Sequence, residues 1–240
     1  MSQWMIYGAN GYTGTLLAQT AAARGLKPVL AGRNTRAITQ LGESLGLPHQ
    51  CFDLHDQQAL QQPLADHRVI LNCAGPFSAT SQPLIDACLA TGCHYLDITG
   101  EIDAFVAAQA RQTDAEQANI VICPGVGFDV IPTDCIAARL KQELPDADRL
   151  ALGFDSRSAL SPGTAKTSVE GLKYGGRIRK DDRIVSVPLA YQSRDIDFGN
   201  GTKHAVTIPW GDIATAWFST GIDHIEVFLP MAPSAATRLR

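Results

Sequence analysis

The strongest chemical signal in the sequence is a turn with three regularly spaced glycines near its start. Gly8 permits a tight turn, Gly11 lets the backbone approach a diphosphate, and Gly14 lets a helix pack closely on a strand. The free N–H groups and the positive dipole end of the following helix attract the anion. The expected cofactor contacts are Gly8, Asn10, Gly11, Tyr12, Thr13 and Gly14. Since 21 glycines in 240 residues also produce such spacing by chance, a merely structural turn is the alternative.

The end of the second predicted strand indicates which dinucleotide binds. An NAD site places Asp or Glu there to accept from the ribose 2′-hydroxyl, but this sequence has Ala31, Gly32, Arg33 and Asn34. The planar guanidinium of Arg33 can instead bind a 2′-phosphate, with Asn34 beside it. We therefore expect NADP, although Arg33 as an ordinary solvated loop cation remains the alternative.

Two further strand ends face the expected cofactor crevice. Asp53 can reach the adenine amino group or cap a helix at 56–65, and the sequence does not decide between these roles. Ala74, Gly75, Pro76 and Phe77 leave the fourth strand at the carboxyl edge, where ligands of open α/β sheets bind, and are expected to run toward the nicotinamide. A simple glycine-proline turn is the alternative. Cys73 has no base nearby in sequence and is interpreted as a core residue.

Acid and base groups are expected in two later loops that should face the same crevice. Glu101 and Asp97 lie in the loop 95–101, and Asp129 and Asp134 lie in the loop 124–134. Such carboxylates can transfer protons or cap loops. Lys166 lies near the start of a helix predicted at 164–175, where it either contacts an anionic substrate group or is solvated. The candidate catalytic residues are thus Asp129, Lys166 and Glu101.

No metal site is expected. His94, His204 and His224 lie in predicted strands and lack the spacing of metal ligands.

The elements that would position these residues alternate between short apolar strands and helical segments. The predicted strands are 4–7, 28–31, 49–52, 69–73, 94–96 and 120–123. The predicted helices are 12–24, 35–45, 56–65, 80–91, 102–117 and 133–142, the last capped by Thr133 or Asp134. Right-handed crossovers between such strands build an α/β doubly wound parallel sheet, the Rossmann plan. Gly25, Gly46 and Gly92 follow helical stretches as left-handed caps.

After Pro145 the pattern changes to one rich in strands. Strands are predicted at 150–154, 184–188, 194–198, 205–209 and 225–229, with helices at 164–175 and 211–219. We therefore predict two domains. Residues 1–144 form a Rossmann NADP-binding domain, and 145–240 form a smaller α+β domain with a mixed or antiparallel sheet that binds substrate and is the expected homodimer contact.

Composition excludes several classes of partner. The net charge of −4 provides no field for nucleic acid, and no apolar run approaches the length of a membrane span. The N-terminus lacks the basic and apolar segments of a secretion signal. Six cysteines without a C-x-x-C pair are typical of reduced thiols, which predicts a cytoplasmic protein.

Several motifs together resemble the saccharopine dehydrogenase-like family, and within it the bacterial trans-acting enoyl reductases. They are MIYGANGYTG at 5–14, LAGRN at 30–34, NCAGPF at 72–77, YLDITGE at 95–101, PGVGFDVIPTD at 124–134 and PWGD at 209–212. The resemblance implies an NADP-dependent oxidoreductase with a nucleotide domain followed by a mixed α+β domain. Family members continue beyond the point where this sequence stops, so the resemblance also implies that their C-terminal part is missing here.

These observations favour an NADP(H)-dependent oxidoreductase that transfers hydride to or from a small organic substrate at a carbonyl, imine or activated double bond. The first alternative is a non-catalytic NADP-binding regulatory or assembly protein. The second is an interaction protein in which the glycine turn binds nothing.

Overall fold

The computed structural model describes residues 4–156 and 175–239, which form two compact units. The first unit contains the residues up to Thr99 together with Asp103–Gly127. The second contains Gly100–Ile102 and the residues from Phe128 onward. Sequence patterns placed the boundary after residue 144, whereas the helix before it packs with the second unit. The functional assignment of the two domains stays a prediction.

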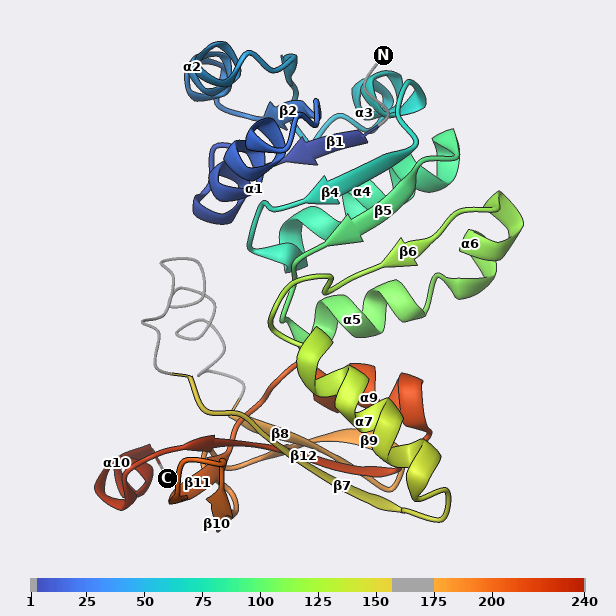
Figure 1. Cartoon of the computed structure of the whole chain (residues 1–240). Helices are drawn as coiled ribbons and strands as arrows, with labels where there is room; N and C mark the ends of the chain where they lie inside the picture. The colour runs from blue at the N-terminus through green and yellow to red at the C-terminus, as the bar shows by residue number, and fades with distance from the viewer. Residues whose placement is uncertain (1–3, 157–174, 240) are drawn as a thin grey trace. The chain divides into compact units, whose positions relative to one another are not determined.

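The first unit is a six-stranded parallel sheet with helices on both faces (Figure 1). Its strands are β1 Trp4–Tyr7, β2 Val29–Gly32, β3 His49–Cys51, β4 Val69–Asn72, β5 His94–Asp97 and β6 Ile122–Cys123. Its helices are α1 Tyr12–Ala23, α2 Thr35–Leu45, α3 Gln57–Ala65, α4 Phe77–Thr91, α5 Ile102–Gln109 and α6 Gln112–Ala118. The strand order β3-β2-β1-β4-β5-β6 confirms the predicted doubly wound fold and places its switch point between β1 and β4.

Alternating side chains of β1 build the two cores of this unit. Ile6 packs with Ala18 of α1 and Ile38 of α2 on one face. Met5 and Tyr7 belong to the core on the other face, which includes residues of α3 and α4. Because strand side chains alternate between faces, one four-residue strand anchors both helix layers.

Two predicted helices of the first unit differ from the observed ones. The segment predicted as one helix at 102–117 is two helices, and Arg111 between them pairs with Asp86 of α4 and Asp114 of α6. Helix α4 begins at Phe77, three residues before the predicted start, with Pro76 as its N-cap residue. Proline suits the start of a helix because the missing N–H is not needed there.

The second unit contains a mixed six-stranded sheet. Its strands are β7 Arg149–Gly153, β8 Gly176–Lys180, β9 Arg183–Val187, β10 Ser193–Asp197, β11 Thr202–Thr207 and β12 His224–Pro230. The order is β10-β11-β12-β8-β9, and β7 pairs in parallel with β12. The helices are α7 Ile131–Glu143, α9 Asp212–Thr220 and α10 Pro233–Leu239, of which α7 and α9 pack against each other and the sheet (Figure 1).

The sequence analysis missed β8 and α10, and its predicted helix at 164–175 lies outside the described residues. β8 carries Arg177, Arg179 and Lys180, so its charges concealed the strand pattern. Arg179 is nevertheless only 6% exposed. Its Nε donates to the carbonyl oxygen of Ile213 at 2.8 Å, and its guanidinium lies 4.5 Å from the centre of the Trp217 ring. These contacts compensate the burial of the cation.

Within the described ranges 4–156 and 175–239, no helix is long and apolar enough to cross a membrane.

Candidate functional site

The glycine turn between β1 and α1 leaves no room for side chains at two of its positions. Gly8 has a φ of +75°, and a Cβ there would lie 2.7 Å from the amide nitrogen of Ala74. A Cβ on Gly14 would lie 2.3 Å from the carbonyl oxygen of Gly8. The first glycine therefore brings the turn against the end of β4, and the last brings α1 against the turn.

Helices α1 and α4 begin at the carboxyl ends of neighbouring strands without a side-chain cap. Strand β1 pairs with β4 directly before these helices start. The N-cap residues are Gly11 and Pro76, and neither helix has an acidic residue in its first turn. Neither N-cap residue thus caps its helix, and the two helix N-termini lie at the switch point of the sheet, which is where a Rossmann fold binds a diphosphate. The contribution of α4 was not predicted.

Arg33 lies at the end of β2 with its side chain exposed. In the described part of the chain it has no ion pair, and no carboxylate occurs between Val29 and Gln40. Asn34, also predicted to contact the cofactor, caps α2 by accepting from the amide of Ala37 at 3.1 Å. The local arrangement offers a phosphate group one unpaired guanidinium on a well-anchored turn.

Asp53 does not cap α3, which was one of its two predicted roles. Its Oδ1 accepts from the amide of His55 at 2.9 Å, which forms a turn before α3 without capping that helix. The other carboxylate oxygen can still meet an adenine amino group, so this contact stays a prediction.

The segment Ala74 to Phe77 is fixed by polar contacts from β4 and α4. Asn72, which is fully buried, accepts from the amide of Ala74 at 2.9 Å and donates to Thr80 at 3.1 Å. Thr80 in turn donates to the carbonyl oxygen of Ala74 at 2.6 Å. Burial raises the pKa of the neighbouring Cys73 thiol to about 12, which agrees with a core residue and not with a nucleophile.

Asp97, one of the loop carboxylates, is a structural group at the end of β5. It is fully buried and accepts four hydrogen bonds, from the Tyr95 hydroxyl at 2.7 Å, Ser81, and the amides of Thr99 and Gly125. Burial raises its pKa, and these donors oppose that rise. The bond from Gly125 joins the end of β5 to the loop after β6, and the bond from Ser81 joins it to α4.

Two of the three candidate catalytic residues lie in described parts of the second unit. Asp129 is half-buried, and its Oδ2 lies 2.7 Å from where a Cβ on Gly100 would be, directly before Glu101. Burial raises the pKa of Asp129. Its carbonyl oxygen accepts from the indole Nε1 of Trp210 at 2.6 Å. Lys166 lies outside the described residues.

A third carboxylate, Asp212, joins Asp129 and Asp134 at the contact of α7 and α9. It is the first residue of α9 and is fully buried. Burial, together with the charges of Asp134 and Asp129, raises the pKa of Asp212 to about 7. In the sequence, Asp212 is marked only as part of the motif PWGD at 209–212. The available signal was an aspartate opening a largely apolar helix.

The expected capping of α7 by Thr133 or Asp134 is wrong. The helix begins earlier, at Ile131, with Val130 as the N-cap residue and no side-chain cap. Asp134 instead accepts from the hydroxyl of Ser219 on α9 at 2.8 Å.

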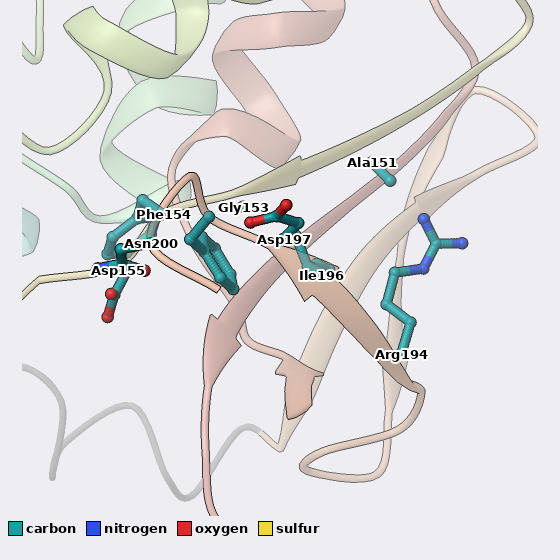
Figure 2. A pocket seen from close by; sticks show the side chains of 9 residues that line it. Ala151, Gly153, Phe154, Asp155, Arg194, Ile196, Asp197 and Asn200 are labelled. Carbon is teal, nitrogen blue, oxygen red and sulfur yellow. The ribbon is translucent and has the colours of Figure 1, made fainter. Parts of the chain in front are cut away.

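A cavity of about 600 Å³ also lies in the second unit, beside β7 and β10. Its lining includes Arg194, Asp155 and Asn200, and Figure 2 shows the guanidinium at one end and the other two residues at the opposite end. None of the predicted site residues that the structure describes lines it. Asp155 is paired with Lys203.

Comparison with known proteins identifies the family. The model of the saccharopine dehydrogenase NADP binding domain matches residues 4–123, which is half of the chain. A probable mitochondrial saccharopine dehydrogenase-like oxidoreductase of Arabidopsis thaliana is 30% identical over 73% of this chain and 44% of its own length. A putative trans-acting enoyl reductase of Mycobacterium tuberculosis is 30% identical over 70% of this chain and 43% of its own. The chain therefore spans less than half the length of these relatives.

A solved structure supports the fold over both units. The apo saccharopine dehydrogenase (L-Glu forming) of Saccharomyces cerevisiae aligns with a TM-score of 0.68 and 14% identity, over 98% of this chain and 56% of that one. At this identity the likeness concerns the fold alone.

Proposed function

The chain belongs to the saccharopine dehydrogenase NADP-binding family, and from this premise we propose that it is an NADP(H)-dependent oxidoreductase acting on a small organic substrate. The reaction is hydride transfer to or from a carbonyl, an imine or an activated double bond. The observation that carries the proposal is the switch point between β1 and β4, where α1 and α4 begin with the N-cap residues Gly11 and Pro76. Arg33 follows the neighbouring strand β2, is exposed, and has no ion pair among the described residues.

The residues of the first unit fit NADP. Gly8 and Gly14 exclude side chains from the turn, and Gly11 exposes backbone to a diphosphate. In the proposal the N–H groups of α1 and α4 bind the diphosphate, Arg33 binds the 2′-phosphate, and Ala74 to Phe77 flank the nicotinamide. The bound coenzyme would supply the hydride.

The proton that accompanies hydride transfer is assigned in the proposal to Asp129. Its raised pKa keeps a larger fraction of the carboxyl protonated near neutral pH than an ordinary aspartate has, which suits a general acid. Glu101 is the alternative donor, because it directly follows Gly100, which packs against Asp129. Lys166 remains a predicted contact for an anionic substrate group.

The test is turnover of NADPH with a panel of 2-oxo acids, imines and enoyl esters. We expect one class to be reduced, and Asp129→Asn to lower kcat by about 100-fold with little change in coenzyme affinity. Asp148→Asn, an exposed aspartate of the same unit, is the matched control and should leave turnover unchanged. NADPH binding without turnover on any class, including with a longer form of the protein, would favour the non-catalytic regulatory or assembly role.

The proposal includes a homodimer formed through the second unit. Ile136 and Leu140 of α7 and its C-cap residue Leu144 are spaced by four residues and are 57%, 44% and 55% exposed. An exposed apolar stripe of this kind is typical of a protein contact. All six cysteines are free thiols, which favours a reducing compartment such as the cytoplasm.

A further inference from the structure

The contact between α7 and α9 buries polar atoms that lack partners. Asp212 is 0% exposed, and in the described part of the chain neither of its carboxylate oxygens has a hydrogen-bond partner of good geometry. The Oδ1 of Asp134 and the hydroxyl oxygen of Thr215 are also buried without a hydrogen-bond partner among the described residues. Unpaired buried polar atoms are rare in folded proteins, so this group requires an explanation.

These atoms face one another across the two helices. Asp212, Thr215 and Ser219 lie three and four residues apart on α9 and therefore share one face of that helix. Ser219 donates to the Oδ2 of Asp134 on α7 at 2.8 Å, which places Asp134 against this face. The carboxylates of Asp212 and Asp134 are thus neighbours, and the charge of Asp134 raises the pKa of Asp212.

Few donors are available to two ionised carboxylates here. Thr133 lowers the pKa of Asp212 through its hydroxyl, but that hydroxyl also donates to the carbonyl oxygen of Val130 at 3.1 Å. On β8, Arg179 is engaged by the Ile213 carbonyl oxygen, the Trp217 ring and Asp182. The buried residues of β12 include Ile225 and Val227, which are apolar.

The described residues contain no group of three or more His, Cys, Asp or Glu suited to hold a metal ion. A proton on Asp212 removes the charge repulsion and converts one acceptor oxygen into a donor, for which the unpaired Oδ1 of Asp134 is a neighbouring acceptor. Pairs of aspartates in other proteins share a proton for the same reason.

The turn that opens α9 also holds the loop of Asp129. Trp210, two residues before Asp212, donates its indole N–H to the carbonyl oxygen of Asp129, and the carbonyl oxygen of Trp210 accepts from the amide of Ile213. We propose that Asp212 is a positioning residue, a buried protonated acid that joins α9 to α7 and thereby holds Asp129 through Trp210. This inference rests on the proposed function, in which Asp129 is the proton donor.

The sign of the pH dependence follows from the raised pKa. An acid with a folded pKa of about 7 and an ordinary unfolded value near 4 favours folding while it is protonated. That contribution is complete below the unfolded pKa, is lost as the pH rises toward the folded pKa, and changes no further above it.

The first experiment measures urea unfolding of the wild type and of Asp212→Asn between about pH 5 and pH 8.5. Asparagine imitates the protonated acid and cannot ionise. Relative to the variant, the wild-type unfolding constant should rise about tenfold per pH unit up to about pH 7 and then level off. Because Asp97 and Asp129 are present in both proteins, their own titration cancels to a first approximation in this comparison. A constant ratio across this range would overturn the proposal, as would failure of Asp212→Asn to fold.

The second experiment follows the indole N–H signal of Trp210 by NMR, assigned from its loss in Trp210→Phe. In the wild type this signal should shift with a midpoint near the pKa of Asp212, and in Asp212→Asn it should keep the low-pH position throughout. Asp212→Ala, which removes the proposed donor to the Oδ1 of Asp134, should lose that position. A signal that does not respond to pH in the wild type, or that responds equally in Asp212→Asn, would overturn the positioning role. Neither experiment uses NADP(H), so failure of coenzyme binding would overturn the proposed function while leaving this inference to its own test.

Discussion

At the residue scale, the choice of coenzyme depends on Arg33. Its guanidinium is exposed and unpaired among the described residues, so a 2′-phosphate would add a charge-assisted contact without breaking an existing one. The 2′-hydroxyl of NADH carries no charge for this guanidinium to bind, and the turn has no carboxylate to accept a hydrogen bond from that hydroxyl.

We expect Arg33→Asp to weaken NADPH binding by about 10- to 100-fold while leaving NADH affinity unchanged or improved. Titration calorimetry with both coenzymes measures the ratio. Arg68→Asp is the matched control, because Arg68 is exposed in the same unit but precedes β4 at the opposite edge of the sheet. Equal losses of NADPH affinity in the two variants would show that the change in net charge, and not a contact of Arg33 with the 2′-phosphate, causes the effect.

Tyr95 tests whether Asp97 is a structural group. Its hydroxyl donates to Asp97 at 2.7 Å and accepts from Asn72 at 3.2 Å, and both partners are fully buried. Tyr95→Phe should lower the free energy of unfolding by about 1–3 kcal/mol, because two buried polar groups lose a partner. Chemical denaturation measures it, and a change below about 0.5 kcal/mol would contradict the network.

At the element scale, the turn before α1 contains one glycine required for packing and another expected to contact the coenzyme. Gly14 is a packing position, whereas Gly11 is an exposed N-cap residue whose added Cβ would lie 3.2 Å from the carbonyl oxygen of Gly8. The two glycines therefore predict different defects.

Gly14→Ala should destabilise the first unit by at least about 2 kcal/mol, because its Cβ would collide with backbone. Gly11→Ala should cost about 1 kcal/mol or less in stability but weaken NADPH binding by about tenfold or more. Thermal denaturation and calorimetry on both variants separate these effects. Unchanged NADPH affinity in a folded Gly11→Ala protein would show that the diphosphate does not bind at this turn.

Elements of the first unit were predictable because their signals are local. Apolar strand runs and the left-handed caps Gly46 and Gly92 lie in adjacent sequence, and the structure confirms both caps. Strand β8 was not predictable, since the burial of Arg179 depends on a carbonyl group and a ring from α9. Asp212 was missed for a related reason, because its environment comes from residues about eighty positions earlier, joined only when α7 packs on α9.

At the scale of the whole molecule, association through the second unit follows from the apolar stripe on α7. We expect sedimentation of the wild-type chain to give twice the chain mass, and Leu140→Glu to give the single chain mass, because a buried charge opposes the contact. Glu116→Gln, a change on α6 of the first unit, is the control. A wild-type monomer at all concentrations would contradict dimerisation.

The most direct test of the whole account is calorimetric titration of the folded wild-type chain with NADPH and with NADH. The account predicts a saturable heat with one equivalent of NADPH and about 10- to 100-fold weaker binding of NADH. No heat with either coenzyme, or equal affinity for both, would contradict it.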